Sequence, residues 1–292
     1  MNSSQTKLRL RLLTIAVNEE FFTVVRKGMN DAAAAMQVEA DLAGTPGVEA
    51  SELVRLTRQA IADGVDGIGL NICDADAFTD VIAEAKARSI PVVAFNIDAS
   101  KGGSGNLSSI AQDFHTAGEA LGRRAAAAIP KGANVIITMH DDGVSALEER
   151  LAGVQAGLRH HDIHWRRLCT GQNPERGADL LREAIERFPV KALLGTGQAD
   201  TEACGLAAKS LAPSQPYVAG FDLSPGIVDL MAEGHIDFAV DQQPYAQGFY
   251  PVVQLALYLR YGLLPSSLDA GAAFIDRSNL EAIQQLSRQS IR

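Results

Sequence analysis

Apolar runs of strand length alternate along this chain with longer segments that place hydrophobic residues at helical spacing. The pattern predicts strands near 10–17, 36–42, 66–70, 91–96, 107–111, 133–138, 164–169, 191–195, 217–221, 236–241 and 272–275. It predicts helices near 20–35, 49–63, 75–88, 114–128, 144–159, 175–188, 200–211, 224–233 and 245–261. Such alternation indicates βαβ units, and the strands are too many for one doubly wound sheet. We therefore expect an α/β protein with two parallel sheets.

Three breaks in this pattern mark places where the chain can pass from one sheet to the other. The flexible stretch Lys101–Gly105 precedes a short strand-like segment, a second break falls near 240–245, and a third falls near 270. We expect two lobes joined by a three-segment hinge. The N-terminal lobe would hold residues 1–111 plus 243–271, and the C-terminal lobe residues 112–242 plus 272–292.

Composition narrows the class of protein. Hydrophobic residues make up 47% of the 292 residues, which is enough to bury a full core. A net charge of −9 argues against a nucleic-acid partner, because phosphate binding needs clustered Lys and Arg. The three cysteines match neither a disulfide framework nor a metal motif. We expect no cofactor and no metal.

Polar residues end several of the predicted strands. Asp222 ends the strand that begins at Val218, Gln242 follows the strand near 236–241, and Asn96 ends the strand that begins at Pro91. Ligands of open α/β sheets bind at the carboxyl ends of the strands. We therefore expect these side chains at the mouth of a ligand cleft, where an amide suits a hydroxyl group. For Asn96 the alternative is a plain turn residue.

Two further segments carry candidate contacts. Phe21 and Phe22 could form an aromatic platform for the C–H face of a sugar, with Glu19 accepting hydroxyl protons. The alternative is a capped helix with two core phenylalanines. Arg150 offers a planar fork that can hold two oxygens, and its alternative is a solvated charge on a helix surface.

The sequence matches known catalytic and cofactor-binding motifs poorly. Gly195–Asp200 resembles half of a dinucleotide fingerprint, but the third glycine is missing. We interpret it as a tight strand-to-helix turn with Asp200 as N-cap and Gln198 near the cleft. His160–His164 is interpreted as a surface loop, and no nucleophile elbow, Walker motif or zinc-protease motif is present. We expect no enzyme activity.

Taken in order, these motifs resemble the ribose-binding-protein family of periplasmic solute-binding proteins, over roughly Leu8 to Leu286. The segments that carry the resemblance are Glu19–Phe22, Asp63–Ile68, Ile90–Val93, Ser145–Arg150, Gly220–Asp222 and Asp241–Pro244. The resemblance implies the type I periplasmic binding fold, with two Rossmann-like lobes. It implies a monomer that captures a monosaccharide or related polyol in the interlobe cleft by hinge closure. ABC permease subunits in the membrane would be its partners, in the periplasm, with an export leader that this sequence lacks.

The resemblance also assigns the ligand contacts one at a time. They are Glu19, Phe21, Phe22, Asn96, Arg150, Gln172, Gln198, Asp222 and Gln242. Two positions depart from the ribose type, because Ile97 stands where that type has an arginine and Gln172 falls near the place of an aromatic contact, which is lost here. These departures argue against ribose itself and leave another pentose, a deoxy sugar, a cyclitol or a linear polyol.

Other functions compete with this interpretation. The first is the effector-binding core of a lactose-repressor-like transcription regulator, which would need a helix-turn-helix before the first strand. Only about seven residues precede that strand, so we expect this alternative to fail. A Rossmann-type enzyme that uses NAD is disfavoured by the broken glycine pattern. A chemotaxis receptor or sensor kinase as an additional partner is left open.

Overall fold

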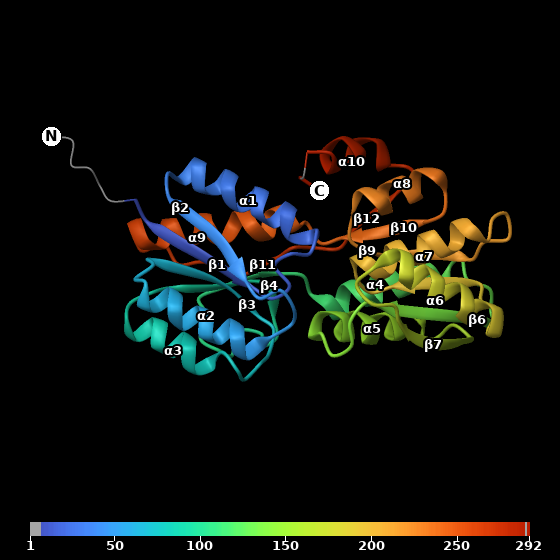
Figure 1. Ribbon diagram of the computed structural model, residues 1–292, viewed down its shortest axis with the longest axis horizontal. Coiled ribbons are helices and arrows are strands. Elements are labelled where there is room, and N and C mark those ends of the chain that lie inside the picture. Colours follow the sequence, from blue (N-terminus) through green and yellow to red (C-terminus); the bar gives the residue numbers. More distant parts are fainter. Residues whose placement is uncertain (1–6, 290) are drawn as a thin grey trace. The chain divides into compact units, whose positions relative to one another are not determined.

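The computed structural model describes residues 7–289 and 291–292, and its contacts divide the chain into two compact units. Unit 1 comprises the chain up to Gln112 together with Gln243–Ala270. Unit 2 comprises Asp113–Gln242 together with the stretch from Gly271 through the last helix. The chain therefore passes between the units three times. Each unit is an α/β layer structure with helices on both faces of one sheet (Figure 1).

Unit 1 is built on a six-stranded sheet in the order β11-β5-β4-β3-β1-β2, with every neighbouring pair parallel. Helices α1 and α9 pack together on one face, and α2 and α3 cover the other (Figure 1). The elements are β1 (Arg9–Thr14), α1 (Phe21–Met36), β2 (Glu39–Gly44), α2 (Ala50–Ala62), β3 (Gly67–Ile72), α3 (Thr79–Ala87), β4 (Val92–Asp98), β5 (Ser109–Ala111), α9 (Pro244–Tyr261) and β11 (Leu268–Asp269).

Unit 2 holds a second six-stranded sheet, in the order β12-β10-β9-β8-β6-β7. One hydrophobic cluster lies under α4 and α5, and another lies under α6, α7, α8 and α10 on the opposite face. The elements are α4 (Phe114–Ala126), β6 (Ala133–Met139), α5 (Ser145–Leu158), β7 (Ile163–Cys169), α6 (Pro174–Arg187), β8 (Ala192–Gly195), α7 (Gln198–Ser210), β9 (Tyr217–Phe221), α8 (Pro225–Glu233), β10 (Phe238–Asp241), β12 (Ala273–Asp276) and α10 (Leu280–Ser287).

Glycines bring the backbones of α4 and α5 into direct contact. A Cβ at Gly118 of α4 would lie 2.3 Å from the carbonyl oxygen of Arg150 in α5. A Cβ at Gly157 of α5 would lie 2.4 Å from the carbonyl oxygen of Glu119 in α4. Neither position tolerates a side chain without separation of the helices, so this contact fixes the place of Arg150 within unit 2.

The alternation in the sequence predicts the layers correctly, with some local differences. Strand β2 starts at Glu39 rather than 36, because α1 runs to Met36 and Gln37 ends it in the left-handed region at φ 53°. Strand β12 pairs antiparallel with β10, so unit 2 is not purely parallel. The pattern missed α10 and the two-residue strand β11.

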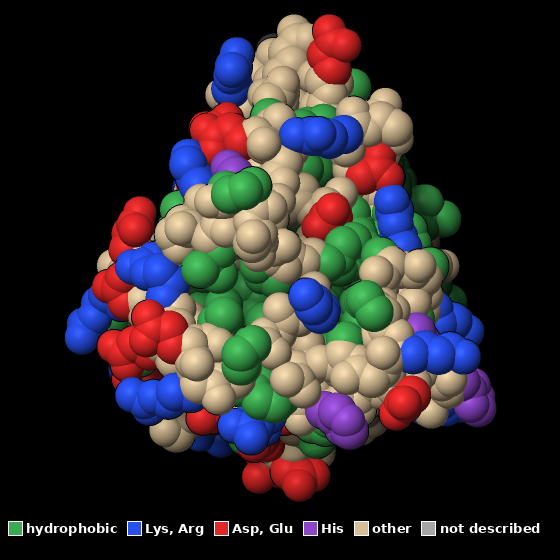
Figure 2. Space-filling view, turned by 90° about the vertical axis from the view of Figure 1, so that its right-hand side faces the viewer, with side chains coloured by type: hydrophobic (Ala, Val, Ile, Leu, Met, Phe, Trp, Pro, Cys, Tyr) green, Lys and Arg blue, Asp and Glu red, His purple; other side chains and the backbone are tan. Residues whose placement is uncertain are grey.

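The surface and the helices add two observations. In the view of Figure 2, Lys and Arg side chains lie interspersed with Asp and Glu, so that face presents a mixed charge. Over residues 7–289 and 291–292, none of the helices is long and apolar enough to cross a membrane.

Candidate ligand-binding site

Each unit has a polar residue at the carboxyl edge of its sheet whose backbone adopts the left-handed conformation. Asn96 in β4 has φ 62°, and Asp222, directly after β9, has φ 72°. Asn and Asp adopt this conformation more readily than other residues with a Cβ. Backbone strain of this kind collects at functional sites. The two residues therefore mark the edge at which to look for ligand contacts in each unit.

In unit 1, Asn96 belongs to a buried hydrogen-bonded set that we call the amide chain: Thr14, Asn71, Asn96 and Gln247. Asn71 Nδ2 donates to Thr14 Oγ1 at 3.2 Å and to Asn96 Oδ1 at 2.9 Å. Asn96 Nδ2 donates to Gln247 Oε1 at 3.1 Å. Thr14 Oγ1 itself donates to the carbonyl oxygen of Ile15 at 3.0 Å. Because the Thr14 hydroxyl donates its proton to that carbonyl, Thr14 must accept from Asn71. This requirement fixes which group donates in every hydrogen bond of the amide chain.

The amide chain is uncharged and almost fully buried. Asn71 and Gln247 are 0% exposed, and Asn96 is 8% exposed. Oδ1 of Asn71 is a buried acceptor without a hydrogen-bond partner in the described part of the chain. A buried polar atom without a partner is costly and calls for an explanation such as a bound ligand or water. The set therefore presents neutral amide groups held in one orientation.

The aromatic pair lies at the start of α1. The rings of Phe21 and Phe22 meet edge to face, with centroids 5.2 Å apart and an interplanar angle of 88°. Both belong to the hydrophobic cluster between α1, α9 and the sheet of unit 1. Glu19 is half-buried, and its backbone N–H donates to the carbonyl of Ala16 at 2.9 Å. The pair thus has a core role in unit 1, and its stacking on a sugar ring stays a prediction.

Arg150 is buried in unit 2, which excludes the interpretation as a solvated surface charge. Its Nη1 donates to the carbonyl oxygen of Thr196 at 2.9 Å and lies 3.6 Å from Asp222 Oδ2. Its guanidinium lies 4.1 Å above the Phe221 ring and 5.2 Å from the Phe114 ring. A buried guanidinium needs such partners, because desolvation of an unpaired charge is very costly.

Asp222 and Gln242 form the next link of this set. Gln242 Nε2 donates to Asp222 Oδ1 at 2.6 Å, and both residues are buried. Burial raises the pKa of the Asp222 carboxyl, while Arg150 and Gln242 oppose the rise. The structure therefore brings together three of the predicted contacts of unit 2, which are Arg150, Asp222 and Gln242.

Two residues of this set escaped the sequence reasoning. Asp200 is fully buried in α7, where its Oδ1 lies 2.8 Å from His140 Nδ1. Its Oδ2 accepts from Thr138 Oγ1 at 3.0 Å and from the N–H of Thr196 at 2.7 Å. The interpretation of Asp200 as N-cap is wrong, because Gly197 is the N-cap residue of α7. We call Arg150, Asp222, Gln242, Asp200 and His140 the charged set.

Gln198 and Gln172 lie outside the charged set. Gln198 is half-buried as the first residue of α7. Gln172 is exposed in the loop after β7, which is the edge strand of its sheet. Within the described residues, neither side chain has a hydrogen bond to the set, so both assignments stay predictions.

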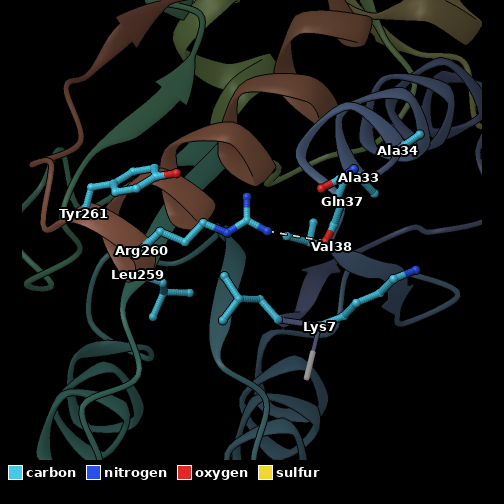
Figure 3. Close-up of a pocket in the computed structure, with 9 residues that line it drawn as sticks. Lys7, Ala33, Ala34, Gln37, Val38, Leu259, Arg260 and Tyr261 are labelled. Atoms are coloured by element: carbon cyan, nitrogen blue, oxygen red, sulfur yellow. Dashed lines mark hydrogen bonds between the residues drawn. The ribbon is translucent and has the colours of Figure 1, made fainter. Parts of the chain in front are cut away.

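A separate groove of about 930 Å³ lies at the other edge of the sheet in unit 1 (Figure 3). Its lining comes from the start of the chain and from the ends of α1 and α9: Lys7, Leu8, Ala33, Ala34, Gln37, Val38, Leu259, Arg260 and Tyr261. Arg260 reaches across it, and its Nη2 donates to the Gln37 carbonyl at 3.4 Å. Since Leu8 precedes β1, this is the amino edge of the parallel strands, where ligands of such sheets do not bind.

Comparison with known proteins places the chain in a family. The sequence profile of the periplasmic binding protein domain matches residues 12–262. The xylose/arabinose-binding protein XylF of Sulfolobus acidocaldarius is 26% identical over 288 residues, which is 92% of this chain and 71% of that protein. The ribose import binding protein RbsB of Escherichia coli is 24% identical over 249 residues, 83% of this chain and 81% of that protein.

A solved structure extends the similarity to nearly the whole chain. The carbohydrate transporter from Acidothermus cellulolyticus in complex with myo-inositol is 27% identical, with a TM-score of 0.85. The match covers 98% of this chain and 100% of that one. These findings confirm the type I periplasmic binding fold and favour a solute-binding protein over a repressor core. The relatives are binding and transport proteins, and this chain belongs to the periplasmic binding protein domain family.

Proposed function

We propose that this chain is the solute-binding protein of an ABC importer, and that residues of both units jointly hold one uncharged monosaccharide or related polyol. The observation that carries the proposal is the pair of buried polar sets. Each lies at the carboxyl edge of its own sheet, where α/β sheets bind ligands.

The chemistry of the two sets supports a neutral, hydroxyl-rich ligand. A hydroxyl group donates one hydrogen bond and accepts others, so it can meet an amide N–H as well as a carboxylate. The amide chain carries no charge, and in the charged set Arg150 lies beside Asp222. Relatives named for xylose and arabinose, ribose and myo-inositol bind ligands of this class.

The proposed mechanism is closure about the three chain crossings. A ligand that touches both units stabilises the closed state, because only that state makes both groups of contacts. In unit 1 the proposed contacts are Glu19, Phe21, Phe22 and Asn96. In unit 2 they are Arg150, Gln172, Gln198 and Asp222, with Gln242 at the end of the unit where the chain crosses.

The remaining parts of the proposal follow from the family. The protein works in the periplasm as a monomer without enzyme activity, and it delivers its ligand to permease subunits in the membrane. The family match over residues 12–262 supports this assignment.

A thermal-shift screen tests the proposal. The plate holds D-ribose, D-xylose, L-arabinose, deoxy sugars, myo-inositol and alditols, with NAD and ATP as controls. A ligand at about a hundred times its Kd adds about 2.7 kcal/mol to the free energy of unfolding, which raises Tm by several degrees. Isothermal titration then confirms each hit. Stabilisation by NAD or ATP without stabilisation by any sugar or polyol would contradict the proposal.

A further inference from the structure

His140 lies at the carboxyl edge of the sheet in unit 2, beside the charged set. It directly follows β6, which neighbours β8, and β8 neighbours β9, the strand that Asp222 directly follows. Its side chain is 12% exposed, so the ring lies at the margin of the unit rather than in its core.

The imidazole ring of His140 is held by two contacts. Asp200 Oδ1 lies 2.8 Å from its Nδ1, and Asp200 is in turn fixed by Thr138 and by the N–H of Thr196. The ring also lies against the backbone of Gly197. A Cβ at that position would lie 2.4 Å from Cε1 and 2.6 Å from Nδ1 of the ring. Glycine at position 197 therefore leaves the space that the imidazole ring occupies.

These contacts also select the tautomer of His140. The Asp200 carboxylate accepts only, so Nδ1 must carry the proton of this hydrogen bond. In the neutral imidazole Nε2 is then an acceptor. An oriented ring with a buried carboxylate behind it is typical of preorganised binding sites, where supporting residues lock the contact residue in place.

We propose that His140 is a further ligand-contact residue, whose Nε2 accepts a hydrogen bond from a ligand hydroxyl next to the one bound by Asp222. This inference rests on the proposed function. His140 and Asp222 both accept, so they suit two neighbouring hydroxyl groups that both donate, as in a vicinal diol. Asp200 is a positioning residue, because it acts on the ligand only through the imidazole.

The test compares His140→Asn with the unmodified protein by isothermal titration with D-xylose, D-ribose and myo-inositol. Asparagine keeps an N–H near the place of Nδ1, so Asp200 retains a donor, and it removes Nε2. We expect an affinity loss of about three- to tenfold, the value of one hydrogen bond, with an unchanged Tm. The matched control is His164→Asn on the exposed edge strand β7, which should bind as the unmodified protein does.

Monodeoxy analogues separate a contact from a structural role. The loss caused by His140→Asn should disappear for the analogue that lacks the hydroxyl bound by His140, and should persist for the other analogues. An unchanged affinity, or an equal loss for every analogue, overturns the inference and leaves the proposed function standing. If the unmodified protein binds none of the three sugars and polyols, the proposed function fails and this inference fails with it. A ¹⁵N NMR spectrum with the proton on Nε2 instead of Nδ1 also contradicts it.

Discussion

The amide chain of unit 1 and the charged set of unit 2 both place buried polar side chains at a sheet edge, but the chemistry of these side chains differs. Both lie at the carboxyl edge of a six-stranded sheet, and each includes a left-handed residue, Asn96 or Asp222. In unit 1 the buried side chains are neutral: Asn71 donates to both Thr14 and Asn96, and Asn96 donates onward to Gln247. In unit 2 a guanidinium and two carboxylates share the interior.

The two sets differ in how much stability and affinity the protein loses when one member is removed. Buried charges are stable only as long as every partner is present, and removal of one partner leaves the other without compensation. Neutral amides lose less when one of them is removed, because an unmade hydrogen bond costs only about 1–3 kcal/mol. We therefore expect unit 2 to be the more sensitive half, both in stability and in affinity.

The largest effect is expected from Arg150→Met. The substitution leaves Asp222 buried without its cation and removes the donor to the Thr196 carbonyl. We expect a loss of about 3–5 kcal/mol in the free energy of unfolding, measured by urea denaturation. The double variant Arg150→Met with Asp222→Asn removes both charges and should recover much of that loss. Equal stability of Arg150→Met and the unmodified protein would break the comparison.

A large effect on affinity is expected from Asp222→Asn. Asparagine tolerates the backbone at φ 72°, so the change removes charge with little strain. A hydrogen bond to a charged group contributes about 1.5–3 kcal/mol, so affinity should fall by about one to two decades in isothermal titration. Undiminished binding of the sugar identified by the screen would argue against this contact.

The same variant has a distinct pH profile. Burial raises the pKa of Asp222, so the carboxylate becomes protonated at a higher pH than an ordinary aspartate as the solution is acidified. If the carboxylate is the form that binds, the unmodified protein should lose affinity as the pH falls through this raised value. The Asp222→Asn variant should show a flat profile over the same range.

A smaller effect is expected in unit 1 from Asn71→Leu. The variant removes the donor to Thr14 and Asn96 and leaves both acceptors buried. We expect a loss of about 1–3 kcal/mol in unfolding free energy, less than for Arg150→Met. Gln247→Leu acts on the other end of the Asn96 amide, so the two changes should be non-additive in a double-mutant cycle. Strict additivity would show that the amide chain does not act as a unit.

The smallest effect is expected from salt. Both sets are buried and the proposed ligand is neutral, so dissolved salt has little effect on the interactions between protein and ligand. Between 0.05 and 0.5 M NaCl the affinity should change by less than about twofold. A steep dependence on salt concentration would indicate a charged ligand and would contradict the class proposed above.

Much of the fold follows from the sequence because strand and helix periods are local signals. Arg150, Asp222 and Gln242 could be found because strand ends and helix starts are also local. Asn71 and Gln247 gave no such signal, since one lies inside a buried strand and the other inside a helix. Their role depends on contacts between distant positions, such as the bond between Asn96 and Gln247, 151 residues apart.

His140 could have been found by the rule that identified Asp222, because it is the polar residue that follows a buried strand. Its partner could not, since Asp200 is 60 residues away and looked like a cap for its own helix. Helix α10 was missed although one of its faces is apolar, with Leu280 and Ile283 buried. Only the contact between His140 and Asp200 depends on long-range packing, whereas His140 and α10 carried local signals that the prediction did not use.

The glycine contact between α4 and α5 has a consequence for redesign. Gly118 faces the main-chain oxygen of Arg150, so the anchor point of the guanidinium is set by two backbones and not by exchangeable side chains. A biosensor engineer who wants a new analyte should therefore treat Arg150 as a fixed reference and vary exposed positions that are only predicted to contact the ligand, such as Gln172. Libraries that randomise residues 118 or 157 would displace that reference and lose most of their members.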